Sequence, residues 1–81
     1  MNSFKKTFLN NANDLIIDYQ NVLFYVIWDE ESLPVIQCDF YTIIQQIECV
    51  TAVSFDTWLV NDELNVYIEF NHDGNINLYT M

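Results

Sequence analysis

The last third of the chain alternates apolar and polar residues, and this pattern constrains the fold more than any other feature. Two runs show the alternation of half-buried strands: 64–70 (LNVYIEF) and 75–79 (NINLY). A three-residue loop aligns Phe70 with Ile76, whereas a two-residue loop would place Phe70 opposite Asn77 and mix buried with exposed positions. Such three-residue loops need a left-handed residue at their end, and Gly74 is the only glycine in the chain. The sequence therefore predicts a hairpin with its loop at 72–74.

Before this hairpin, the sequence predicts a helix, a strand, and one element that is either a helix or a strand. Apolar residues recur at the 3.6-residue spacing of a helix over residues 4–19, and Ser3 is the expected N-cap. Residues 22–28 form an unbroken apolar run that suits a strand covered on both faces. Asp39 can cap a short helix, but the β-branched side chains that follow suit a strand nearly as well. Both interpretations of residues 39–48 stay open.

Residues 53–60 join the hairpin through a turn at 61–64 and complete a C-terminal meander. The sequence therefore predicts an α+β fold in which an N-terminal helix packs on a small antiparallel sheet of about four strands that ends in the meander. A second short helix is added if residues 39–48 are helical. A chain of 81 residues offers apolar surface for one core, so we expect a single domain spanning residues 1–81.

Side-chain alternation gives the meander two faces with different compositions. The predicted core face carries Phe55, Leu59, Val66, Ile68, Phe70, Ile76 and Leu78. The other face mixes acids, amides and large aromatic residues: Asp56, Trp58, Asn65, Tyr67, Glu69, Asn77 and Tyr79. Such a mixture is typical of a recognition surface. The alternative is that the N-terminal helix covers the aromatic residues and leaves only the acids exposed.

Charge is the feature that bears most directly on function. Twelve carboxylates stand against two basic residues, Lys5 and Lys6, and the formal net charge is −10. No lysine or arginine follows Lys6, so internal ion pairs cannot neutralise the carboxylates. A surface of one sign repels itself and attracts a partner of the opposite sign, here a basic protein. Direct binding of nucleic acid is not expected, because contacts to phosphates need Lys and Arg.

Two acidic runs beside predicted strand ends are candidates for contact with a partner's Arg or Lys: Asp29-Glu30-Glu31 and Asp62-Glu63. The alternative for each run is a solvated loop without a partner. With the mixed face of the meander, the runs give the predicted partner-binding residues: Asp56, Trp58, Tyr67, Glu69, Tyr79, Asp29, Glu30, Glu31, Asp62 and Glu63.

The residues that could carry chemistry are few, and they predict no enzyme, no cofactor and no metal site. Cys38, Cys49 and His72 do not supply the roughly four ligands that zinc needs. With no arginine, one histidine and one glycine, the chain has little with which to hold a substrate phosphate or an oxyanion. We expect His72 to be an exposed turn residue and both cysteines to be reduced, buried thiols. The absence of a secretory signal and of a bilayer-spanning run favours a cytoplasmic protein.

Three stretches near the end of the chain carry a family resemblance: 55–58 (FDTW), 67–70 (YIEF) and 72–76 (HDGNI). They resemble the strand-turn-strand end of small acidic immunity proteins of bacterial toxin systems, such as those paired with contact-dependent growth inhibition toxins and colicin-type nucleases. The resemblance implies a cytoplasmic inhibitor of one cognate toxin, commonly a nuclease with a basic active site. Carboxylates would bind the toxin's Lys and Arg, and Trp58 and the tyrosines would fill apolar pockets.

Two other functions are compatible with the acidity. A phage-type DNA mimic would inhibit a host defence nuclease, and it should carry carboxylates in two rows along an elongated face. An acidic secretion chaperone or adaptor is the other alternative. An immunity protein should instead concentrate its carboxylates in one compact patch.

Overall fold

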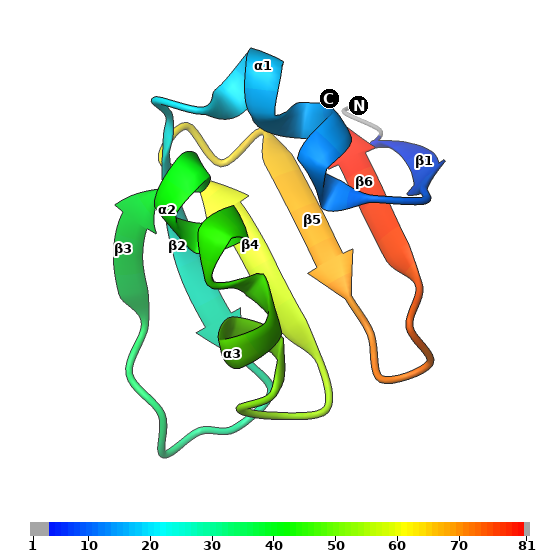
Figure 1. Ribbon diagram of the computed structural model, residues 1–81. Coiled ribbons are helices and arrows are strands. Elements are labelled where there is room, and N and C mark those ends of the chain that lie inside the picture. Colours follow the sequence, from blue (N-terminus) through cyan, green and yellow to red (C-terminus); the bar gives the residue numbers. More distant parts are fainter. Residues whose placement is uncertain (1–3, 81) are drawn as a thin grey trace.

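The computed structural model describes residues 4–80, apart from the side chains of residues 12 and 17, and its strands form one antiparallel sheet (Figure 1). In chain order the strands are β1 (Lys5–Leu9), β2 (Leu23–Trp28), β3 (Ile36–Asp39), β4 (Thr57–Asn61), β5 (Val66–Phe70) and β6 (Ile76–Thr80). Across the six-stranded sheet the order is β1-β6-β5-β4-β2-β3. The first strand therefore lies beside the last, at one edge of the sheet.

The predicted N-terminal helix is wrong, and with it the predicted four-stranded sheet. Residues 5–9 pair along β6, and only the short 3-10 helix η1 (Ala12–Leu15) and helix α1 (Ile16–Tyr19) follow. Asn11 separates strand from helix, because its backbone is extended and its side chain accepts a hydrogen bond from the N–H of Asn13. Helices this short are marginal alone, so pairing with β6 decides the structure of this segment. The predicted N-cap Ser3 lies outside the described residues.

Most of residues 39–48 is helical, which decides between the two interpretations. Helix α2 (Phe40–Gln45) is followed by α3 (Ile47–Thr51). Asp39 caps α2, since its Oδ2 accepts a hydrogen bond from the N–H of Thr42 at 3.0 Å and its Oδ1 accepts one from the Thr42 hydroxyl at 2.8 Å. This cap turns the chain out of β3 and directs α2 across the sheet.

The hydrophobic core lies between the sheet and helices α2 and α3, which stand in front of β2 and β4 in Figure 1. Its fully buried large residues are Phe24, Phe40, Leu59 and Ile68. Trp28 fixes α3, because its indole N–H donates a hydrogen bond to the carbonyl of Val50 at 2.8 Å. Phe55 was predicted in the core but is 79% exposed. Strand β4 begins only at Thr57, so the alternation of side chains does not extend back to residue 55.

The C-terminal hairpin has the predicted register. Phe70 pairs with Ile76, and the loop turns through Gly74 at a φ of +87°. The side chain of Asn71 accepts hydrogen bonds from the N–H groups of Asp73 and Asn75, which hold the loop closed. In the described part of the chain, no helix is long and apolar enough to cross a membrane.

Candidate functional site

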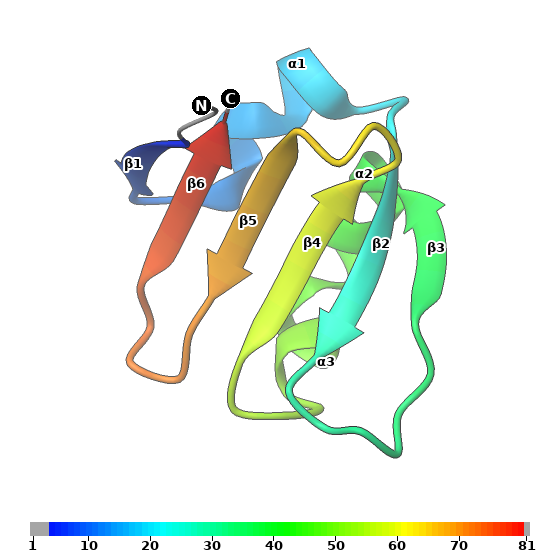
Figure 2. The ribbon, with the colours of Figure 1, turned by 180° about the vertical axis from the view of Figure 1, so that it is seen from behind.

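One face of the sheet carries no helix in the described residues, as Figure 2 shows from behind. We call it the open face; the side chains on it from β2, β4, β5 and β6 are Leu23, Tyr25, Ile27, Trp58, Val60, Tyr67, Glu69, Asn77 and Tyr79. Strand β2 is therefore not covered on both faces as predicted, and Ile27 is 38% exposed. The helices occupy the other face, so the alternative in which a helix covers the aromatic residues does not hold.

Four aromatic side chains line a hollow of about 220 Å³ on the open face: Phe4, Trp58, Tyr67 and Tyr79. We call this hollow the aromatic pocket. Tyr67 and Tyr79 are neighbours across β5 and β6, and the ring centroids of Trp58 and Tyr79 are 5.9 Å apart. Phe4 meets Tyr67 edge to face at 5.0 Å. The strands hold the rings side by side, so they present a preformed aromatic surface.

The centre of the open face has little charge. Glu69 is the only carboxylate in β4, β5 and β6, and its Oε1 accepts a hydrogen bond from the side-chain amide of Asn77 at 3.0 Å. From the edge strand β1, the ammonium of Lys6 lies 5.8 Å from the centroid of the Tyr79 ring. Lys6 and Phe4 contribute to this site although sequence analysis assigned both to a helix. The pairing of β1 with β6 puts Lys6 there, and Phe4 directly precedes β1.

The β5–β6 hairpin, the β2–β3 loop and the entry to β4 meet at one end of the sheet, which we call the hairpin end (Figure 1). The predicted run Asp29-Glu30-Glu31 lies there and is exposed. The N–H of Asp29 donates a hydrogen bond to the carbonyl of Asp56 at 3.1 Å, so the two segments are in contact. The hairpin end thus gathers carboxylates that are far apart in the sequence.

Asp56 also binds His72 within the chain. Its Oδ1 accepts a hydrogen bond from the backbone N–H of His72 at 3.1 Å and lies 3.2 Å from the ring Nδ1. The Asp56 hydrogen bond raises the pKa of His72, and the nearby charges of Asp73 and Asp56 add to this effect. His72 is exposed in the turn as predicted, but its pairing with Asp56 was missed because no local pattern joins residues 16 positions apart.

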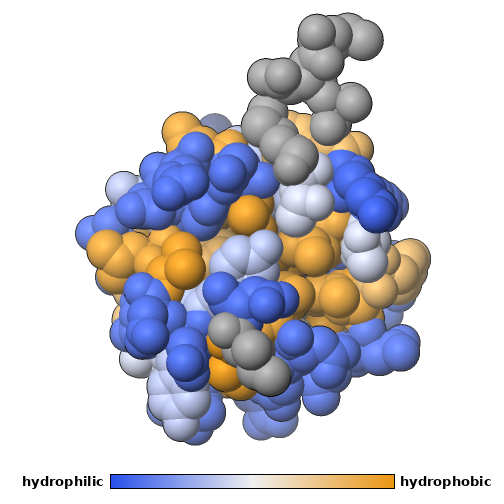
Figure 3. Space-filling model, turned by 90° about the horizontal axis from the view of Figure 1, so that it is seen from above, coloured by the Kyte–Doolittle hydropathy of each residue, from blue (hydrophilic) through white to orange (hydrophobic). Residues whose placement is uncertain are grey.

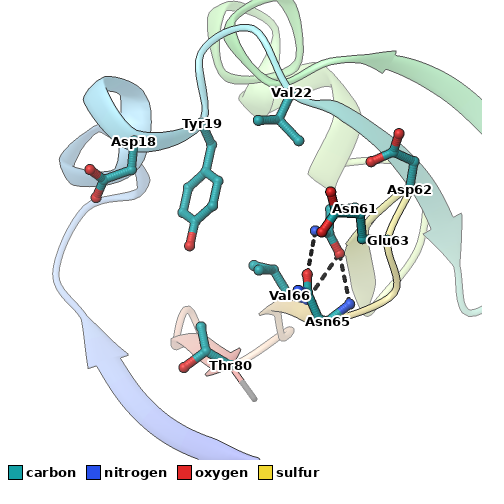
Figure 4. Close-up of a pocket in the computed structure, with 9 residues that line it drawn as sticks. All are labelled: Asp18, Tyr19, Val22, Asn61, Asp62, Glu63, Asn65, Val66 and Thr80. Carbon is teal, nitrogen blue, oxygen red and sulfur yellow. Dashed lines mark hydrogen bonds between the residues drawn. The ribbon is translucent and has the colours of Figure 1, made fainter.

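The opposite end of the sheet, which we call the α1 end, carries the predicted pair Asp62-Glu63 in the β4–β5 turn. A cavity of 360 Å³ opens there (Figure 4), lined by Asp18, Tyr19, Val22, Asn61, Asp62, Glu63, Asn65, Val66 and Thr80. Its three carboxylates, including that of Asp18, are on exposed residues. Seen from this end, hydrophilic residues surround hydrophobic ones (Figure 3).

The amide of Asn61 holds the β4–β5 turn. Its Oδ1 accepts hydrogen bonds from the N–H groups of Asn65 and Val66 at 3.0 and 2.9 Å, and its Nδ2 donates to the side chain of Asn65 (Figure 4). Asn61 is buried, so these bonds are protected from water. The turn therefore holds Asp62 and Glu63 at a fixed place beyond the strands.

A family model matches residues 2–79 of the chain, and its description is CdiI immunity protein, EcoliA0-like. The chain belongs to this family. The match covers nearly the whole chain and confirms the resemblance to immunity proteins of contact-dependent growth inhibition, which sequence analysis had based on the last third alone. No curated protein sequence gave a significant match.

Membership in the CdiI immunity protein family indicates a bacterial toxin inhibitor, so the implied partner is a cognate toxin. Proteins of this kind are typically not enzymes. Among the described residues, no group of His, Cys, Asp and Glu side chains could hold a metal ion. The cysteines are free; Cys38 is half-buried, and Cys49 on α3 is exposed instead of buried as predicted.

The structure thus divides the ten predicted partner-binding residues into three groups. Trp58, Tyr67, Tyr79 and Glu69 lie together on the open face. Asp29, Glu30, Glu31 and Asp56 lie at the hairpin end, and Asp62 and Glu63 lie at the α1 end. The acids therefore form neither the one compact patch expected of an immunity protein nor the two rows expected of a DNA mimic, because the strands that separate the two ends carry few charges.

Proposed function

We propose that this CdiI immunity protein inhibits a basic cognate toxin, a nuclease, in the cytoplasm by placing its open face against the toxin's cationic active site. One observation carries the proposal: half-buried aromatic rings occupy the helix-free face of the sheet, and carboxylates stand beyond both ends of its strands. Stable interfaces have this organisation, with aromatic residues at the centre and charged residues on the rim.

The charges explain how such an inhibitor would recognise a nuclease. A nuclease needs Lys and Arg to bind phosphates, and the same groups form strong charge-assisted hydrogen bonds with carboxylates. In this proposal the carboxylates of both ends contact the toxin's cations while the aromatic centre excludes water. The net charge of −10 also attracts the toxin at a distance, which speeds association.

The alternative of a DNA mimic gains no support from the shape. The molecule measures 32 × 26 × 24 Å along its principal axes, so no elongated face is available for two rows of carboxylates. The acids at the two ends are separated by the aromatic centre of the open face. Nothing in the described residues favours a secretion chaperone over a toxin inhibitor.

Replacing Trp58 with alanine tests the proposal. We expect Trp58→Ala to weaken binding of the purified cognate toxin domain at least tenfold, or about 1.4 kcal/mol, because an aromatic anchor at the centre is lost. Isothermal calorimetry gives the affinity, and circular dichroism shows whether the variant is folded. The matched control is Tyr41→Ala, which removes an exposed aromatic ring from α2 on the opposite side of the sheet. Equal affinities for the folded Trp58→Ala and Tyr41→Ala variants would refute the proposed binding face.

A further inference from the structure

We infer that the aromatic pocket receives an arginine side chain of the toxin, bound by cation–π contact and by Glu69. This inference rests on the proposed function and deepens it, because it names the chemical group that the centre of the open face recognises. It also reverses the expected roles: the aromatic residues form the pocket, and the toxin supplies the side chain that fills it.

The walls of the pocket consist of aromatic rings. Phe4, Trp58, Tyr67 and Tyr79 come from residue 4 and from three neighbouring strands, and they line an open hollow of about 220 Å³. A space of this size accommodates the end of one side chain. The faces of aromatic rings carry partial negative charge and attract cations, most strongly when the cation is partly removed from water.

A cation already lies over one of these rings. The ammonium of Lys6 is 5.8 Å from the centroid of the Tyr79 ring, which is within the range of cation–π attraction. The pairing of β1 with β6 puts Lys6 directly beside Tyr79. The chain thus places one of its two lysines over a wall of the pocket, so this ring attracts a positive group, and an incoming arginine would compete with Lys6 for it.

Glu69 supplies the opposite charge beside the pocket. It pairs with Trp58 across β4 and β5 and follows Tyr67 by two residues on the same face. Its Oε1 accepts a hydrogen bond from Asn77, and no hydrogen bond from another described residue reaches its Oε2. The Oδ1 of Asn77, a residue only 4% exposed, also has no partner among the described residues. One oxygen of the half-buried Glu69 carboxylate is therefore free to accept a hydrogen bond from a bound cation, and a buried acceptor without a donor lies next to it.

Arginine satisfies both parts of this site at once. Its planar guanidinium can stack on a ring and still donate several N–H groups in its own plane, and it is more weakly hydrated than the ammonium of lysine. An apolar side chain would fill the pocket but would shield the Glu69 carboxylate from water without donating a hydrogen bond to it, which is unfavourable. The chemistry therefore favours arginine over both lysine and leucine.

The test uses a small probe so that it does not depend on the toxin. The tripeptide acetyl-Gly-Arg-Gly-amide is titrated into the full chain at constant ionic strength, and the peptide with citrulline in place of arginine serves as its neutral isostere. NMR follows the indole N–H signals of both tryptophans. Trp28 is the internal control, since its indole is bonded to Val50 on the other side of the sheet.

We expect the arginine peptide to shift the Trp58 signal saturably and at least threefold more than the citrulline peptide, with Trp28 unmoved. Glu69→Gln keeps the shape of the side chain and should weaken binding of the arginine peptide at least threefold. Lys6→Gln removes the competing cation and should strengthen binding of the arginine peptide. Equal responses to the two peptides, or no saturable response, would overturn the inference.

Two further outcomes separate this inference from the proposed function. If the Trp58 signal depends on protein concentration and not on the peptide, a second copy of the chain covers the open face and the arginine site is refuted. If Glu69→Gln and wild type respond equally to the peptide while Trp58→Ala still loses the toxin, the proposed function stands without the arginine pocket. Absence of a saturable peptide response in wild type, together with unchanged toxin binding in Trp58→Ala, would refute both.

Discussion

His72 is the single residue whose protonation the fold controls most directly. Its hydrogen bond to Asp56, together with the charges of Asp73 and Asp56, raises its pKa above the ordinary value of 6.5. The fold therefore favours the charged ring. The resulting stabilisation is complete below the pKa of the unfolded chain and is lost as pH rises through the higher pKa of the folded chain. The contact joins the β5–β6 hairpin to the entry of β4, so this loss loosens the hairpin end.

We expect this linkage to appear as a difference between wild type and His72→Gln. Between about pH 6 and pH 8, the urea midpoint of wild type should fall relative to that of the variant, because only wild type loses a charged histidine. The size of the change is limited by solvent, since the ring is 59% exposed. Parallel pH profiles for the two proteins would show that His72 contributes nothing through its charge.

Among the elements, the loops at the strand ends carry the carboxylates that we expect to contact the toxin's cations. Glu63 lies in the β4–β5 turn at the α1 end, whereas Glu48 lies on α3, on the helical side of the sheet. Glu63→Lys and Glu48→Lys change the net charge equally, so only position distinguishes them. We expect Glu63→Lys to slow association with the toxin severalfold more than Glu48→Lys, measured by surface plasmon resonance at low salt. Equal rates would mean that net charge alone attracts the toxin.

The elements also show which parts of the fold can be predicted from sequence. The register of the hairpin could be predicted, because a shift by one residue would exchange its core and solvent faces. Strand β1 could not, because residues 5–9 have the apolar spacing of a helix and their partner strand β6 lies at the other end of the sequence. Phe55 shows a related error, since alternation was extended beyond the true start of β4.

The candidate site was predictable to a similar degree. Alternation placed Trp58, Tyr67 and Tyr79 on one face, and the sheet keeps them together. Whether that face is open depends on the side that α2 and α3 cover, which no local pattern specifies. Phe4 was missed as a wall of the pocket for the same reason that β1 was missed.

At the scale of the whole molecule, the net charge of −10 has opposite effects on folding and on binding. Carboxylates that repel each other destabilise the fold, whereas the same field attracts a basic toxin. Salt screens both the repulsion among the carboxylates and the attraction of the toxin. The Debye length falls from roughly 30 Å at 0.01 M to roughly 8 Å at 0.15 M.

Across this range of NaCl we expect the urea midpoint of the protein to rise while the rate of association with the toxin falls by about tenfold or more. Urea is the suitable denaturant, because guanidinium would itself screen the charges. A urea midpoint that decreases with NaCl, or an association rate that does not change, would contradict this account of the charge.

The pairing of β1 with β6 has a consequence for biosynthesis. Phe4 and Tyr79, two walls of one pocket, lie far apart in the sequence, and Lys5 pairs with Thr80. A nascent chain cannot assemble the pocket while β6 is still inside the ribosome, whatever the other strands have already formed. The aromatic pocket therefore forms only after β6 has left the ribosome and paired with β1.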